Sequence, residues 1–84
     1  MKHADEFSLN QLEALLQELR TLPGIKERSR GVFYRRSKSF LHFHDDPAGL
    51  FADVRIGDEF QRFKVSYPIE KEALLESVRR ELLG

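Results

Sequence analysis

The sequence predicts an α+β fold, a two-layer sandwich of order α-β-β-β-β-α with an antiparallel four-stranded meander and two helices on one face. Three observations predict it. Leucines recur at three- and four-residue steps near both ends of the chain, as in amphipathic helices. Between these segments the apolar period changes to two, and all the connections there are short, which favours antiparallel pairing. We expect a single domain over residues 1–84, with residues 1–6 disordered.

The first helix has the strongest signals. Ser8 is a good N-cap residue, Gln11 completes a capping box, and Phe7 and Leu12 can form a hydrophobic staple. The apolar stripe consists of Leu9, Leu12, Leu15, Leu16, Leu19 and Leu22. Pro23-Gly24 ends the helix, and the basic segment 26–31 that follows is expected to be a turn.

The central segment predicts strands over residues 31–36, 39–44, 50–56 and 60–67. In the second strand, Leu41 and Phe43 should face the core, while Phe40, His42 and His44 should face the other way. Residues 45–49 and Gly57-Asp58 have turn composition. The last helix should begin near Pro68, with acidic residues in its first turn.

Composition limits the class of protein. The chain has no cysteine, so neither a disulfide framework nor a thiolate nucleophile is available. Its N-terminus carries acidic residues instead of the apolar core of a secretory signal, and no apolar run approaches the roughly 20 residues that span a membrane. We therefore expect a soluble, cytoplasmic protein without a membrane partner. The 14 basic and 14 acidic residues cancel, which argues against a protein that coats nucleic acid through bulk charge.

The charges are nevertheless unevenly distributed. Residues 20–38 contain seven basic residues and one acidic residue, whereas residues 45–59 contain five acidic residues and one basic residue. These two blocks could face each other across a dimer or could be solvated loops. The candidate nucleic-acid contacts in the basic block are Arg28, Arg30, Arg35, Arg36 and Lys38.

His42 and His44 could carry chemistry. Side chains two residues apart on a strand share a face and lie roughly 6.5–7 Å apart along the chain. The two imidazoles could bind a transition metal ion with a carboxylate from Asp46 or Asp53, could supply a general acid and base, or could contact an anion or substrate. They could also be ordinary half-exposed histidines. His3 is a poor third ligand, since the terminus that carries it is expected to be disordered.

The same sheet face should carry further polar and aromatic side chains. Phe40, Phe51 and Phe60 would form an exposed apolar patch, and we expect a homodimer through it. Alternatively, the interleaved cations and aromatic rings could bind single-stranded nucleic acid, or could simply pair across strands on a solvated sheet. The predicted ligand or partner face comprises Phe40, His42, His44, Asp53, Arg55, Arg62 and Lys64.

Motifs of enzymes and cofactor sites are missing. The five glycines are dispersed, so there is no glycine-rich phosphate loop. Neither a Gly-x-Ser-x-Gly elbow nor a His-Glu-x-x-His helix occurs. A domain of this size also has little room for a deep pocket. We expect a non-enzymatic binding or interaction domain without a cofactor.

Several short segments carry a resemblance to known proteins: Leu22-Pro23-Gly24, Gly31-Val32-Phe33, Phe40-Leu41-His42-Phe43-His44, Ala52-Asp53-Val54 and Arg62-Phe63-Lys64-Val65. With them, residues 12–83 resemble small bacterial proteins of the "luciferase domain" type, most of them uncharacterised. The Leu-Pro-Gly turn and the helix-then-strands order are also similar to YjbR/MmcQ-like domains, which implies DNA binding; their longer C-terminal half has no counterpart in this chain. Neither resemblance implies catalytic residues.

Overall fold

A computed structural model describes residues 2–84. Its elements are β1 (Lys2–His3), α1 (Glu6–Gln11), α2 (Glu13–Arg20), β2 (Lys26–Ser29), β3 (Val32–Arg35), β4 (Lys38–Asp46), β5 (Gly49–Ile56), β6 (Glu59–Lys64) and α3 (Pro68–Leu83). Strands β2 to β6 form an antiparallel meander in chain order. The predicted α+β class is confirmed, with five meander strands instead of four.

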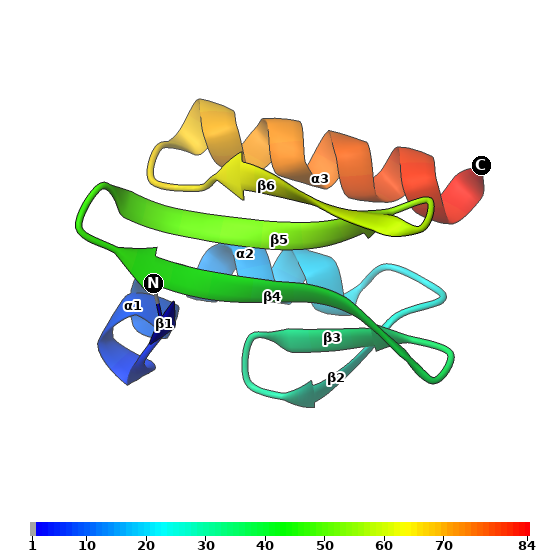
Figure 1. The fold of residues 1–84 in the computed structure, drawn as a ribbon, viewed down its shortest axis with the longest axis horizontal. Helices are drawn as coiled ribbons and strands as arrows, with labels where there is room; N and C mark the ends of the chain where they lie inside the picture. The colour runs from blue at the N-terminus through cyan, green and yellow to red at the C-terminus, as the bar shows by residue number, and fades with distance from the viewer. Residues whose placement is uncertain (1) are drawn as a thin grey trace.

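The long strand β4 lies at the centre of the sheet (Figure 1). On one side it pairs with β5 from Leu41, opposite Val54, to Asp46, opposite Gly49. On its other side it pairs first with β3 and then, near its C-terminal end, with β1. The N-terminus therefore becomes part of the sheet edge.

The hydrophobic core lies between the sheet and the helices. The leucine stripe of α1 and α2 and the apolar positions of α3 pack against Leu41, Phe43, Ala52 and Val54 of the two central strands. The alternation predicted from the sequence thus places these four residues on the helix-covered face, as expected. None of the helices within residues 2–84 has the length and apolar character needed to cross a membrane.

The start of the first helix differs from the prediction. Asp5 is the N-cap, and its side chain accepts a hydrogen bond of 2.9 Å from the backbone N–H of Ser8. Ser8 is buried and donates its hydroxyl to Asp45 Oδ2 at 2.7 Å, which ties α1 to the end of β4. Phe7 is 71% exposed, so the predicted staple is wrong. A turn at Leu12 divides the predicted single helix into α1 and α2.

Two strands form where none was predicted. The segment expected to be a turn forms β2, an edge strand that pairs with β3. Because this strand is mostly exposed, its residues are polar and lack the apolar alternation from which strands are predicted. Lys2 and His3 form β1, and Ala4 N–H continues the contact with a hydrogen bond of 3.1 Å to Phe43 O. The expected disorder of residues 1–6 is therefore wrong for residues 2–6, and residue 1 lies outside the described residues.

The placement of Phe40 also differs from the prediction. Phe33 pairs with Leu41 and Tyr34 pairs with Ser39, so one extra residue, Phe40, is inserted in β4. Such an irregularity interrupts the alternation of side chains. Phe40 is 1% exposed and belongs to the core, not to the open face that carries His42 and His44.

Candidate metal centre

Strands β1 and β4 bring three histidines together. His42 and His44 lie two residues apart on β4, and His3 of β1 is the register partner of His44. One ligand nitrogen from each imidazole lies within 4.8 Å of the other two. The ring centroids are 4.7 Å apart for His42 and His44, and 5.4 and 5.8 Å from His3 to His44 and His42.

This spacing suits a transition metal ion. With metal–nitrogen bonds of about 2.0–2.1 Å and tetrahedral angles, ligand nitrogens lie about 3.3 Å apart. Small rotations of the three rings would bring the nitrogens from their present separations to that value. Three imidazoles leave the fourth position of a tetrahedral ion for water or another ligand, and His3 is the exposed member of the cluster.

The two histidines of β4 have unpaired ring nitrogens. Within residues 2–84, Nδ1 of His42 and Nδ1 of His44 are buried and have no hydrogen-bond partner. An unpaired buried polar atom costs free energy, typically about 1–3 kcal/mol. A metal ion would satisfy such a nitrogen through its lone pair, so the donor set fits a metal ion.

Asp53 lies beside the histidines. His44 Nε2 is 3.0 Å from Asp53 Oδ2, but the ring is not aligned for a hydrogen bond, so this buried nitrogen also has no hydrogen-bond partner within residues 2–84. Arg62 Nε and Nη2 donate two hydrogen bonds, of 2.8 and 2.9 Å, to the same carboxylate. These bonds hold the pKa of Asp53 below its ordinary value, so Asp53 is an anion at neutral pH. A carboxylate beside a ligating imidazole typically orients the ring.

His42 is held in its neutral form. Burial, with a smaller contribution from the charge of His44, lowers its pKa below the ordinary value of 6.5. The Phe60 ring, 5.2 Å away between centroids, contributes to this apolar surrounding. A neutral imidazole is the form that binds metal, so the environment of His42 favours ligation at neutral pH.

Four residues of the predicted face meet at this cluster, and three do not. His42, His44, Asp53 and Arg62 lie together, with Asp53 opposite both His42 and Arg62 in the strand register. Asp46 is not in the cluster, since its carboxylate accepts the Ala48 N–H in the β4–β5 turn. The remaining three residues of the predicted face lie elsewhere: Phe40 is in the core, Lys64 is opposite Phe51, and Arg55 is opposite Phe60.

Sequence reasoning gave His3 little weight as a ligand. A two-residue strand has no detectable periodicity, and the polar N-terminal residues are typical of a disordered terminus. One usable signal exists: Asp5 three residues before Ser8 is an alternative N-cap, and it predicts an ordered helix start close to His3.

The aromatic patch that predicted a dimer is smaller than expected. With Phe40 in the core, Phe51 and Phe60 remain on the open face, and each lies beneath an arginine. The guanidinium carbon of Arg62 is 5.9 Å from the Phe51 ring centroid, and that of Arg55 is 4.5 Å from the Phe60 ring centroid. These contacts cover apolar surface within the chain itself.

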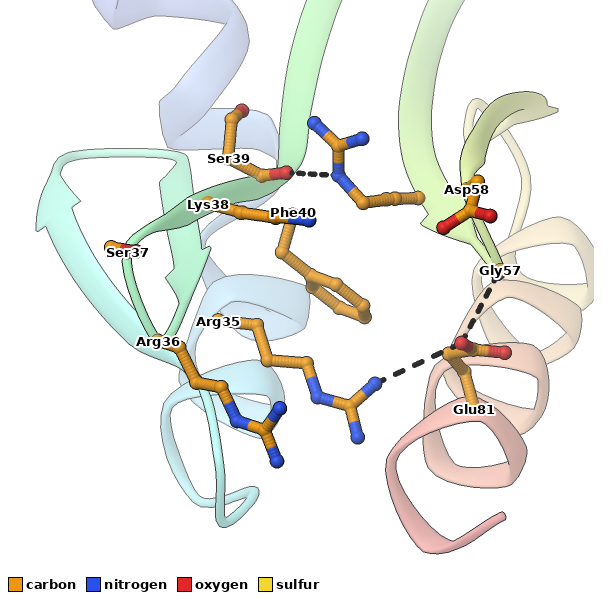
Figure 2. Close-up of a pocket in the computed structure, with 10 residues that line it drawn as sticks. Arg35, Arg36, Ser37, Lys38, Ser39, Phe40, Gly57, Asp58 and Glu81 are labelled. Atoms are coloured by element: carbon orange, nitrogen blue, oxygen red, sulfur yellow. Dashed lines mark hydrogen bonds and ion pairs between the residues drawn. The ribbon is translucent and has the colours of Figure 1, made fainter.

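The basic block does not form one surface. Arg35, Arg36 and Lys38 line a cavity at the β3–β4 turn (Figure 2). Arg28 lies over the Tyr34 ring at 4.7 Å. Arg30 donates hydrogen bonds to Glu6, Asn10 and Glu13, so its charge is already compensated.

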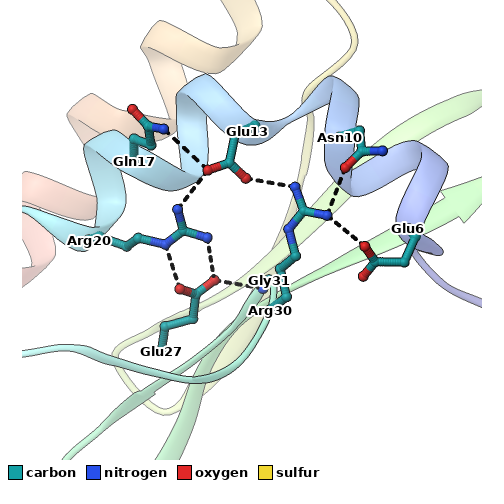
Figure 3. A network of polar contacts seen from close by, with 8 residues as sticks. All are labelled: Glu6, Asn10, Glu13, Gln17, Arg20, Glu27, Arg30 and Gly31. Carbon is teal, nitrogen blue, oxygen red and sulfur yellow. Dashed lines mark hydrogen bonds and ion pairs between the residues drawn. The ribbon is translucent and has the colours of Figure 1, made fainter.

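Arg30 belongs to a network that ties the first helices to the β2–β3 hairpin (Figure 3). Glu13 receives hydrogen bonds from Arg30, Arg20 and Gln17, and Arg20 also binds Glu27. Glu27 in turn accepts the backbone N–H of Gly31 at 2.9 Å. The network gives Arg20 and Arg30 a structural role, and Arg30 is the one candidate nucleic-acid contact that belongs to it.

Glu13 gives the network a pH dependence. Its hydrogen bonds with Arg30, Arg20 and Gln17 lower its pKa from 4.5 to about 2. The stability that this carboxylate contributes is therefore present above pH 4.5 and is lost as the pH falls toward 2. In Glu13→Gln we expect a shallower loss of stability between pH 4.5 and 2, measured by urea unfolding monitored by circular dichroism. The matched control is Glu72→Gln, at an exposed site where the carboxylate has no ion-pair partner within residues 2–84. Equal slopes in both variants would contradict the assignment.

No family model matches the chain. No curated protein or solved structure matches it either. The two resemblances, which rest on short segments, therefore stay expectations, and the proposal for function rests on the geometry of the histidine cluster.

Proposed function

We propose that this chain binds a transition metal ion through His3, His42 and His44. One observation carries the proposal: the pairing of β1 with β4 brings a third imidazole to a histidine pair whose buried Nδ1 atoms have no hydrogen-bond partner within residues 2–84. Imidazole nitrogen suits Zn²⁺, Cu²⁺, Ni²⁺ and Co²⁺. We choose Zn²⁺ as the test ion because it accepts tetrahedral sites with three protein ligands.

The neighbouring residues have supporting roles in this proposal. Asp53, 3.0 Å from His44 Nε2, is placed to accept a hydrogen bond from that nitrogen when the ring turns toward the ion, which leaves Nδ1 of His44 as the ligand atom. Arg62 keeps Asp53 charged and fixed by its two hydrogen bonds. Phe60, packed against His42, shields one side of the cluster from water. Together these contacts make a supported ligand set instead of three independent surface histidines.

The experiment is a metal titration of chelator-treated, tag-free protein. We expect one Zn²⁺ per chain by isothermal titration calorimetry, and a tetrahedral absorption spectrum with Co²⁺. At a free Zn²⁺ concentration 100 times the Kd, the gain in unfolding free energy should be about 2.7 kcal/mol, seen as a rise in Tm. His3→Ala, His42→Ala and His44→Ala should each weaken binding by at least about tenfold.

The control is Asp46→Asn, which removes the charge of the carboxylate that sequence reasoning offered as a ligand but keeps an oxygen to accept the Ala48 N–H. We expect its Zn²⁺ affinity to be unchanged. Binding that survives in the His3→Ala/His44→Ala double variant, or no binding in the unaltered chain at pH 7.5, would refute the proposal. Affinity should also fall in acid, because protons compete with the ion for the imidazole nitrogens.

A further inference from the structure

A second site lies at the other end of the sheet, where the sheet divides into two hairpins. The pairing of β4 with β5 begins at Leu41 and Val54. Before that point β4 pairs with β3 alone, and after it β5 pairs with β6 alone. The two hairpin ends therefore diverge, as Figure 1 shows, and a cavity of about 310 Å³ lies between them and the last turns of α3. We call this cavity the hairpin fork.

Side chains hold the fork at its base. Arg55 Nε donates a hydrogen bond of 2.8 Å to Ser39 O. This bond satisfies a carbonyl of β4 in the part of the strand that does not pair with β5. The buried Phe40 side chain also lines the cavity (Figure 2). Across the fork, Glu81 of α3 accepts the Gly57 N–H at 3.2 Å. The β3–β4 hairpin, the β5–β6 hairpin and α3 therefore bound the cavity. Each of them is held to a neighbour by a hydrogen bond or by core packing.

The lining of the fork is positively charged. It contains four basic residues, Arg35, Arg36, Lys38 and Arg55, against two acidic ones, Asp58 and Glu81. Arg35 is 3.8 Å from Glu81, a loose ion pair. Within residues 2–84, Arg36 and Lys38 are exposed and have no ion pair. Four cations around one small cavity repel one another, and an anion between them would relieve that repulsion.

Arg36 also has an unfavourable backbone conformation. Its φ is +60°, and it is the one non-glycine residue with positive φ in the described part of the chain. Glycine or asparagine would be more favourable at this turn, because a Cβ atom crowds the backbone there. Strained positions of this kind cluster at functional sites. At this position Arg36, whose guanidinium has no ion pair within residues 2–84, is one of the residues that line the fork, as is Arg35 (Figure 2).

We propose that the hairpin fork binds the phosphate group of a small phosphorylated molecule. The excess of two positive charges in the lining matches a phosphate dianion. Guanidinium groups present paired donors that fit phosphate oxygens. The cavity volume is at the lower end of the range for small-molecule sites, which suits a small ligand. The site is distinct from the histidine cluster and does not depend on a metal ion.

The test uses the chelator-treated chain of residues 1–84, so that phosphate cannot bind through a metal ion. Inorganic phosphate, pyrophosphate and glycerol 3-phosphate are titrated at constant ionic strength and followed by amide chemical shifts. We expect saturable binding with shifts at residues 35–39 and 57–58. Arg36→Gly should weaken binding about tenfold, the usual effect of losing one charge-assisted contact. The same substitution should leave Tm equal or higher, because glycine relieves the backbone strain.

Two further variants sharpen the test. Asp58→Asn removes a negative charge from the lining and should tighten binding roughly two- to fivefold. Arg28→Ala removes a cation of the same block that lies over Tyr34, outside the fork, and should change nothing. Three outcomes would overturn the proposal: Arg36→Gly binding like the unaltered chain, Arg28→Ala weakening binding as much as Arg36→Gly, or binding to a single-stranded oligonucleotide without binding to any of the three small phosphates.

Discussion

Phe40→Ala should lose about 3–5 kcal/mol of unfolding free energy, the usual cost of removing a buried phenylalanine side chain. A domain of 84 residues has a small total stability, so this loss should remove much of it. The reason is the extra residue in β4, which turns the Phe40 ring into the core at 1% exposure. The measurement is urea unfolding at 25 °C, followed by circular dichroism.

Phe60→Ala is the matched control. Phe60 is 41% exposed on the open face, so its loss should cost less than about 1.5 kcal/mol. If Phe40 lay on the open face, as strict alternation along the strand predicts, the two variants would lose similar amounts of stability. Equal losses would therefore contradict the placement of the irregularity between Phe33 and Tyr34.

Gly31→Ala should lose about 2–5 kcal/mol. Gly31 has φ +80°, a conformation that costs other residues roughly 1–2 kcal/mol. A Cβ atom there would also lie 2.7 Å from Leu9 Cδ2, and overpacking of a core typically costs about 1–3 kcal/mol more. Leu9 is itself buried, so it has little freedom to move away. Thermal and urea unfolding measure the loss.

Gly57→Ala separates the two contributions. Gly57 also has a positive φ, +65°, but nothing lies within 4 Å of a Cβ atom built on it. We expect it to lose only the conformational part, about 1–2 kcal/mol. The difference between the two variants then measures the close packing of α1 against the β2–β3 turn. A Gly31→Ala variant no less stable than Gly57→Ala would show that Leu9 adjusts freely.

Much of the fold could be predicted from the sequence, because the features that specify it are periodic. The leucine stripe of the first helices and the alternation of Leu50, Ala52, Val54 and Ile56 identify the two layers and their facing sides. The open-face positions His42, His44, Asp53 and Arg62 follow from the same alternation and do lie together.

The parts that could not be predicted depend on single residues or on pairing between distant segments. Periodicity gives no sign of one extra residue in a strand, so Phe40 was assigned to the wrong face. The polar strand β2 gains its order from pairing with β3, not from its own composition. His3 reaches the other histidines only because β1 pairs with β4, a contact that spans about half of the chain.

The short strand β1 makes the N-terminus and the proposed metal ion thermodynamically interdependent. His3 is the one proposed ligand outside β4, and it is held in place by the backbone pairing of residues 2–4 with residues 43–45. Binding of the ion and docking of this segment are linked equilibria, so each strengthens the other by the same factor. If the ion raises the docking equilibrium constant by some factor, docking raises the affinity for the ion by that factor. On the proposed metal site, a partner or modification that detaches the first residues would therefore weaken the affinity for the ion, and loss of the ion would make the same residues more susceptible to proteases.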